Sequence, residues 1–138
     1  MRISLINMAV AESVDPGKYP PGTGKVIKGD PIWFTDKGNP FTCPDYCHDP
    51  RAVKEMREAL SGHCSVRDPE GNIYNCERSR FVVELIQVQN GGGEFHWPMF
   101  GPNANHIFDL IGSTPLQQTE AFLRTRDIWK PGKFVNHS

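Results

Sequence analysis

Glycine and proline interrupt this chain so often that its helices and strands are expected to be short. The 138 residues include 13 glycines and 12 prolines. Both types break regular structure, because proline lacks a backbone N–H and glycine has no side chain to restrict its backbone. Together they make up about 18% of the chain, against roughly 12% in an average protein. The sequence therefore predicts short elements joined by long connections.

The rest of the composition is that of one ordinary globular domain. The length is close to the commonest single-domain size, and 38% of the residues are hydrophobic. We therefore expect a single domain over residues 1–138. The formal net charge is -1, with neither sign concentrated in a block, so the composition does not indicate a surface for polyanions.

Hydropathy argues against a membrane partner. The apolar runs are far shorter than the roughly 20 residues that a bilayer-spanning helix needs. The apolar stretch within the first ten residues is too brief for a secretory signal, and acidic residues follow it directly. We therefore expect a cytoplasmic protein.

The N-terminal third is expected to be an irregular arm followed by strands. Residues 3–6 are compatible with a short strand, but 15–24 hold three prolines and three glycines, so we assign 1–24 to an irregular N-terminal arm. Two β-prone segments follow, at 25–27 and 31–34, and residues 35–40 have turn chemistry.

The clearest element is a helix over residues 50–61. Asp49 suits the N-cap, Pro50 suits the first helical position and Gly62 follows the end. Apolar residues recur inside it at i, i+3 and i+7, which predicts one buried face. That face consists of Val53, Met56 and Leu60, while Lys54 and Glu58 are expected to be solvated.

A hairpin and a long strand are predicted next. Residues 64–76 surround Asp68-Pro69-Glu70-Gly71, a sequence that suits a tight turn. The preferred register places Cys64 opposite Cys76 on a buried face. Residues 81–89 are then expected to form a further strand, so that 25–89 make a β-rich unit that contains the helix.

The C-terminal part, residues 90–138, is expected to be a loop and two short helices. The first helix would begin after Asn103 and end near Gly112. Thr114, Pro115 and Gln117 have the spacing of a capping box, which predicts a second helix to about residue 126.

Four cysteines are the sharpest candidate for a metal site. Four thiolates can bind Zn²⁺ tetrahedrally, and His48 or His63 could replace one of them. The alternatives are buried free thiols, which we favour in a reducing compartment, and a disulfide. We therefore expect no cofactor, with zinc as the alternative. The candidate ligands are Cys43, Cys47, Cys64 and Cys76.

Two further patterns leave other functions open. A Cys/His-dependent enzyme would draw on residues scattered along the chain, but no catalytic signature surrounds them. The C-terminal helices could form a helix-turn-helix that binds DNA through Gln117, Gln118, Arg124 and Arg126. The candidate catalytic residues are Cys47, His48, His63, His96, His106 and Asp109.

An aromatic cluster is the preferred candidate for partner binding. It follows the glycine triplet 91–93, and the segment lacks an alternation that would bury every ring. Aromatic side chains supply much of the energy of protein interfaces. The expected partner-binding residues are Phe95, Trp97 and Phe100, with Trp97 as the preferred probe.

Short motifs between residues 28 and 83 resemble the small SH3-like β-barrels of short phage and bacterial proteins. These are Gly29-Asp30 before a strand, the turn at 35–39, and Val66-Arg67-Asp68 leading through Gly71 to Ser79-Arg80-Phe81. The resemblance implies a binding module with the 50–61 helix inserted, and it brings no catalytic residues with it.

These observations predict an α+β fold. We expect a small antiparallel SH3-like barrel or bent sheet, one inserted helix and a C-terminal pair of short helices. The expected function is a non-enzymatic interaction or inhibitor protein that binds another protein, encoded by a phage and acting in the host cytoplasm if the resemblance holds. A small Cys/His-dependent enzyme and a nucleic-acid-binding module are the alternatives.

Overall fold

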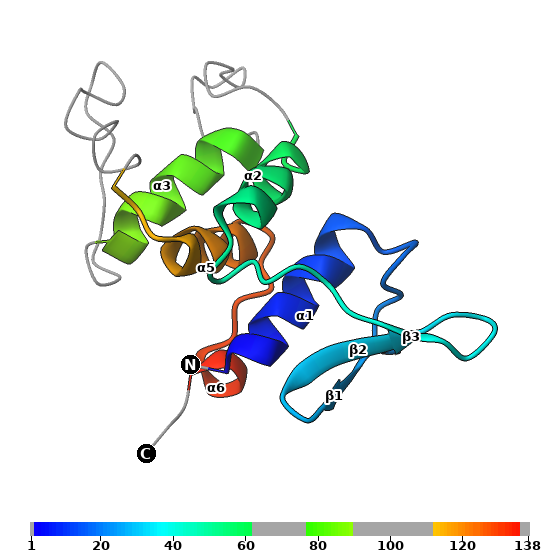
Figure 1. Ribbon diagram of the computed structural model, residues 1–138. Helices are drawn as coiled ribbons and strands as arrows, with labels where there is room; N and C mark the ends of the chain where they lie inside the picture. The colour runs from blue at the N-terminus through cyan, green and yellow to red at the C-terminus, as the bar shows by residue number, and fades with distance from the viewer. Residues whose placement is uncertain (1, 62–76, 90–111, 136–138) are drawn as a thin grey trace, which may run out of the picture.

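The computed structural model describes residues 2–61, 77–89 and 112–135, and it confirms a mixed α+β fold (Figure 1). Helices predominate in the described residues, and a small antiparallel sheet lies beside the N-terminal helix. In chain order the elements are α1 (Ile3–Val14), β1 (Lys25–Ile27), β2 (Asp30–Phe34), β3 (Pro40–Phe41), α2 (Pro50–Glu58), α3 (Glu77–Gln89), α5 (Pro115–Thr125) and α6 (Pro131–Phe134).

The predicted strands at 25–27 and 31–34 are confirmed as β1 and β2. They pair antiparallel, and β3 pairs with the other edge of β2. The strand order β1-β2-β3 is that of an open sheet. An SH3-like barrel is therefore not confirmed by the strands that the structure describes.

The N-terminal segment is not the irregular arm that we expected for residues 1–24. Residues 3–14 form the helix α1, and the short strand predicted at 3–6 is wrong. Ile6 and Val10 lie four residues apart and are both fully buried, so the apolar period is that of a helix. The four residues of the predicted strand, 3–6, are too few to distinguish the apolar period of a helix from that of a strand.

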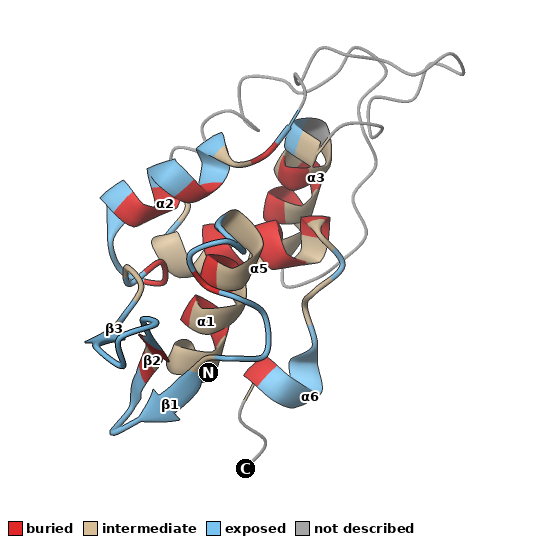
Figure 2. Cartoon of the chain, turned by 90° about the vertical axis from the view of Figure 1, so that its right-hand side faces the viewer, coloured by how far each residue is buried: buried red, intermediate tan, exposed pale blue. Residues whose placement is uncertain are grey.

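The long strand predicted at 81–89 is also wrong, because Glu77–Gln89 is the helix α3. Its β-branched residues favour a strand locally, but Phe81 and Leu85 lie one helical turn apart and are buried. The helix packs along α5, and Figure 2 shows buried surface on both elements. Tertiary packing therefore overrides local propensity here. The SH3-like interpretation needs a strand that begins near Phe81 and closes the barrel, but the structure has the helix α3 at this position.

Two helices agree with the prediction from their caps. Asp49 accepts a hydrogen bond from the Arg51 N–H at 2.9 Å and starts α2. Val53, Met56 and Leu60 are buried as predicted, and Lys54 and Glu58 are exposed. Thr114 and Gln117 form the predicted capping box of α5.

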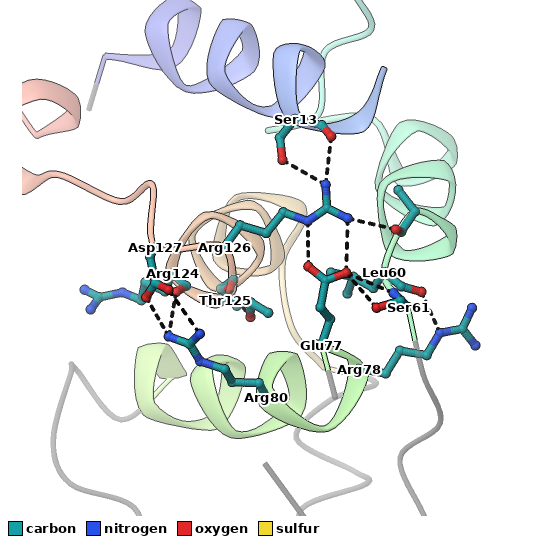
Figure 3. Close-up of polar contacts among 12 residues, drawn as sticks. Ser13, Leu60, Ser61, Glu77, Arg78, Arg80, Arg124, Thr125, Arg126 and Asp127 are labelled. Atoms are coloured by element: carbon teal, nitrogen blue, oxygen red, sulfur yellow. Dashed lines mark hydrogen bonds and ion pairs between the residues drawn. The ribbon is translucent and has the colours of Figure 1, made fainter. Parts of the chain in front are cut away.

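Helix α5 contacts α1, α2 and α3 and carries the centre of the core. Ala121, Phe122 and Leu123 on this helix are fully buried. Arg126, which follows α5, joins the three neighbouring elements: it bonds to Ser13 at the end of α1, to the Ala59 carbonyl after α2, and to Glu77 at the start of α3 (Figure 3).

Other expectations concern segments outside the described residues. These are the hairpin at 64–76 with its Cys64–Cys76 pair, the 90–93 loop and the helix after Asn103. Within the described ranges, none of the helices has the length and apolar character to cross a membrane.

Candidate functional site

The hairpin formed by β1 and β2 is the first candidate site, and its shape is set by a two-residue turn. Lys28 and Gly29 connect the strands, with φ values of 52° and 84°. Positive φ at both positions is typical of a type I′ turn, whose twist matches that of the flanking strands. The Lys-Gly pair between two β-prone segments is a turn signal that the sequence interpretation did not use.

The register leaves the backbone of Val26 on the open edge of the sheet. A two-residue loop closes on a hydrogen-bonded pair, here Ile27 and Asp30, so the next pair, Val26 and Pro31, is the non-hydrogen-bonded kind. The N–H and C=O of Val26 therefore point away from β2. Pro31 points toward β3, where its carbonyl accepts a hydrogen bond from the Thr42 hydroxyl at 2.7 Å.

One face of the hairpin is buried and the other is exposed. Trp33 is 1% exposed and packs edge-on against Tyr19, with ring centroids 4.7 Å apart. Phe34, the next residue along β2, points to the opposite face and is 52% exposed. Figure 2 shows β1 exposed along its length. Val26, Ile27 and Phe34 are the large hydrophobic residues that the described part of the chain exposes.

A polar cavity of about 340 Å³ between α1, β2 and the loop before α2 is the second candidate site. Asn7, buried on α1, donates from Nδ2 to Asp45 Oδ1 at 3.0 Å. Its Oδ1 accepts from the Cys47 N–H at 3.2 Å, so one side chain ties the loop to the helix. Sequence reasoning missed Asn7 because its segment was interpreted as an arm; in a helix, Asn7 occupies the buried face.

Asp45 and His48 form a pair at this cavity. Burial opposes charge on Asp45, but hydrogen bonds from Asn7 and His48 outweigh it and hold the pKa of the carboxyl below its usual value. An ionised carboxylate only accepts, so His48 Nδ1, at 2.9 Å from Asp45 Oδ2, carries the hydrogen in this pair. In the neutral ring, Nε2 then carries the lone pair.

Burial disfavours the thiolate form of Cys43, which lines this cavity, and of Cys47 in the same loop. Cys43 donates its S–H to the Asn7 carbonyl at 3.7 Å. Burial raises the pKa of the Cys43 thiol to about 11 and that of Cys47 to about 12. A reactive cysteine needs the thiolate, which these surroundings disfavour. Cys43 and His48 line one cavity, and the Cys/His-dependent enzyme stays a prediction.

The structure describes only part of the predicted metal and partner sites. Cys43 and Cys47 are free thiols, and in the described ranges no group of three or more His, Cys, Asp or Glu side chains could hold a metal ion. The four-cysteine zinc site stays a prediction, as does binding through the aromatic cluster. Cys64, Cys76, Phe95, Trp97 and Phe100 lie outside the described residues.

Two of the four side chains that the DNA-binding alternative named, Gln118 and Arg126, have partners within the protein. Gln118 is 8% exposed, and its Oε1 accepts from Arg57 Nη1 at 3.1 Å. Arg126 is engaged by Ser13, Ala59 and Glu77 and packs over a phenylalanine ring. Both side chains link neighbouring helices, and DNA binding through the C-terminal helices stays a prediction.

Comparisons of the chain with protein-family models, with curated proteins and with solved structures found no match.

Proposed function

We propose that this protein is a non-enzymatic binding module that receives an extended segment of a partner protein along β1. The observation that carries the proposal is that Val26, Ile27 and Phe34, the large exposed hydrophobics of the described residues, all lie on the β1–β2 hairpin. Exposed apolar residues beside an unpaired strand edge are typical of surfaces that bind other chains.

The edge of β1 supplies the backbone part of the recognition. All three residues of β1 are exposed, and the N–H and C=O of Val26 point outward from the sheet. An extended peptide that adds to such an edge gains main-chain hydrogen bonds, and alternate side chains give it specificity.

Charges near this edge indicate the chemistry of the partner. Lys25 and Lys28 flank the exposed Val26 and Ile27 along the chain. Apolar residues of the bound segment would therefore pack on Ile27, while flanking carboxylates would pair with the two lysines. The partner segment is extended and apolar at its centre, with acidic residues at its ends.

A site-specific cross-link tests this proposal. The photoreactive residue p-benzoylphenylalanine at position 27 of the full chain, on β1, should capture one protein from an extract of the source cells. The captured protein, once purified, should bind the unmodified chain and slow hydrogen exchange at the Val26 amide. Ile27→Asp should weaken binding at least about tenfold, because it places a charge in a desolvated contact.

The control is Lys133→Asp, an exposed position on α6. It should bind like the unchanged chain, and both variants should retain the melting temperature, since neither position is buried. Equal binding by Ile27→Asp, or unchanged exchange at Val26, would overturn the proposal. A concentration-dependent dimer that Ile27→Asp abolishes would identify a second copy as the occupant and would overturn it as well.

A further inference from the structure

A cavity of about 410 Å³ lies between α2 and α3 and reaches α5. Its apolar lining comes from Leu60, Phe81 and Leu85, which are buried, and from Val82, which is half-buried. A cavity of this size lies within the usual range for small-molecule sites, roughly 300–1,000 Å³. It shares no residue with the hairpin surface, so it offers a separate binding site.

The polar lining of this cavity is mostly positive. Lys54, Arg57 and Arg78 contribute three cations, against the single carboxylate of Glu58. This excess stands out in a chain whose formal net charge is -1. In the part of the chain that the structure describes, none of the three cations forms an ion pair with a carboxylate.

Two of these cations are held in place by hydrogen bonds to neutral groups. Arg57 Nη1 donates to Gln118 Oε1 at 3.1 Å, and Arg78 Nε donates to the Leu60 carbonyl at 2.9 Å (Figure 3 shows the Arg78 contact). A guanidinium has five N–H donors, and among the described residues these two bonds use one donor of each side chain. Both bonds position the guanidinium without cancelling its charge.

We propose that this cavity binds a small amphipathic anion, such as a carboxylate carried on a hydrocarbon chain or ring. The apolar lining favours the hydrocarbon, because contact with it removes apolar surface from water. The cations at the cavity favour the carboxylate, which can accept hydrogen bonds from a guanidinium in a bidentate manner. This site goes beyond the proposed protein-binding function and does not depend on it.

Decanoate is a suitable probe, used below its micelle concentration with the ¹⁵N-labelled full chain. Amide shifts should concentrate at Leu60, Arg78, Val82 and Gln118 and should saturate with one affinity. Decanol lacks the charge and acetate lacks the chain, so each should bind at least about fivefold more weakly. Decyltrimethylammonium reverses the charge and should bind more weakly still.

Two variants locate the site. The double variant Lys54→Gln/Arg57→Gln should lower decanoate affinity about fivefold, which corresponds to the loss of exposed charge pairs. The matched control, Lys37→Gln in the exposed β2–β3 turn, should have no effect. Val82→Trp, which fills the cavity, should abolish binding; the double variant keeps the test decisive if Val82→Trp fails to fold.

Three results would overturn the proposal. The first is equal binding of decanoate and decyltrimethylammonium, since the cations would then play no part. The second is a set of amide shifts centred away from α2 and α3. The third is unchanged affinity in the folded double variant.

Discussion

Arg126, the residue after α5, holds Glu77, the first residue of α3, through hydrogen bonds of 2.9 Å from Nε to Oε2 and 3.3 Å from Nη2 to Oε1. The same guanidinium donates to the Ser13 carbonyl at 2.7 Å and to the Ala59 carbonyl at 2.8 Å. One side chain thus links the ends of α1 and α2 to the start of α3 (Figure 3). We infer that Arg126 fixes how these helices meet around α5.

Arg126→Ala is expected to lower the free energy of unfolding by about 2–4 kcal/mol, because it leaves partly buried acceptors without their donor. Urea denaturation followed by circular dichroism measures this loss. Arg80→Ala is the matched control: Arg80 bonds to the exposed Asp127 at 2.7 Å, a kind of pair that contributes little. A loss no larger than that of the control would show that Arg126 does not hold the helices together.

Glu77 should make stability depend on acid pH. Burial opposes its ionisation, but hydrogen bonds from the Ser61 N–H and from Arg126 outweigh it and lower the pKa of the carboxyl below the usual 4.5. A carboxyl whose pKa is lower in the folded state than in the unfolded state stabilises the protein at pH values above its unfolded-state pKa. This contribution disappears as the pH falls through the folded-state pKa. The difference in unfolding free energy between the unchanged chain and Glu77→Gln should therefore shrink below about pH 4.5. A difference that is constant from pH 7 to pH 3 would contradict this explanation.

Cys43 and Cys47 should resist alkylation while the protein is folded. Burial raises the pKa of these thiols to about 11 and about 12, so very little thiolate is present at pH 8. Iodoacetamide labelling, read by mass spectrometry of the peptide that carries both residues, should be at least about tenfold slower in buffer than in urea. Rapid labelling of Cys43 in the folded protein would revive the Cys/His enzyme alternative.

Gly24 should tolerate no side chain, because Trp33 occupies the space beside it. A Cβ at this position would lie 2.7 Å from Nε1 and Cε2 of Trp33, which is 1% exposed. Gly24→Ala is therefore expected to cost about 1–3 kcal/mol of stability through overpacking. Gly132→Ala is the control, because nothing lies within 4 Å of its Cβ position. Equal melting temperatures for the two variants would show that Trp33 can move aside.

Helix caps were the part of the fold that the sequence could predict. Asp49 and Thr114 each accept a hydrogen bond from a backbone N–H two or three residues later, so their signal lies within one helical turn. The buried face of α2 followed from the same local periodicity. Of the candidate functional residues, Cys43 and His48 do line one cavity, but no sequence pattern indicated that Asn7 would join them there.

The sequence by itself therefore determined the mixed composition of helices and strands, the positions of β1 and β2, and the capped starts of α2 and α5. Only the tertiary structure decided that residues 81–89 form a helix. Their β-branched side chains favour a strand locally, while burial of Phe81 and Leu85 along α5 favours a helix. The tertiary structure also decided which hydrophobic residues are exposed, because exposure depends on which face of a strand or helix another element covers. Trp33 and Phe34 are adjacent in sequence, yet only Trp33 is covered, by the packing of Tyr19 and Phe41 on one side of the sheet.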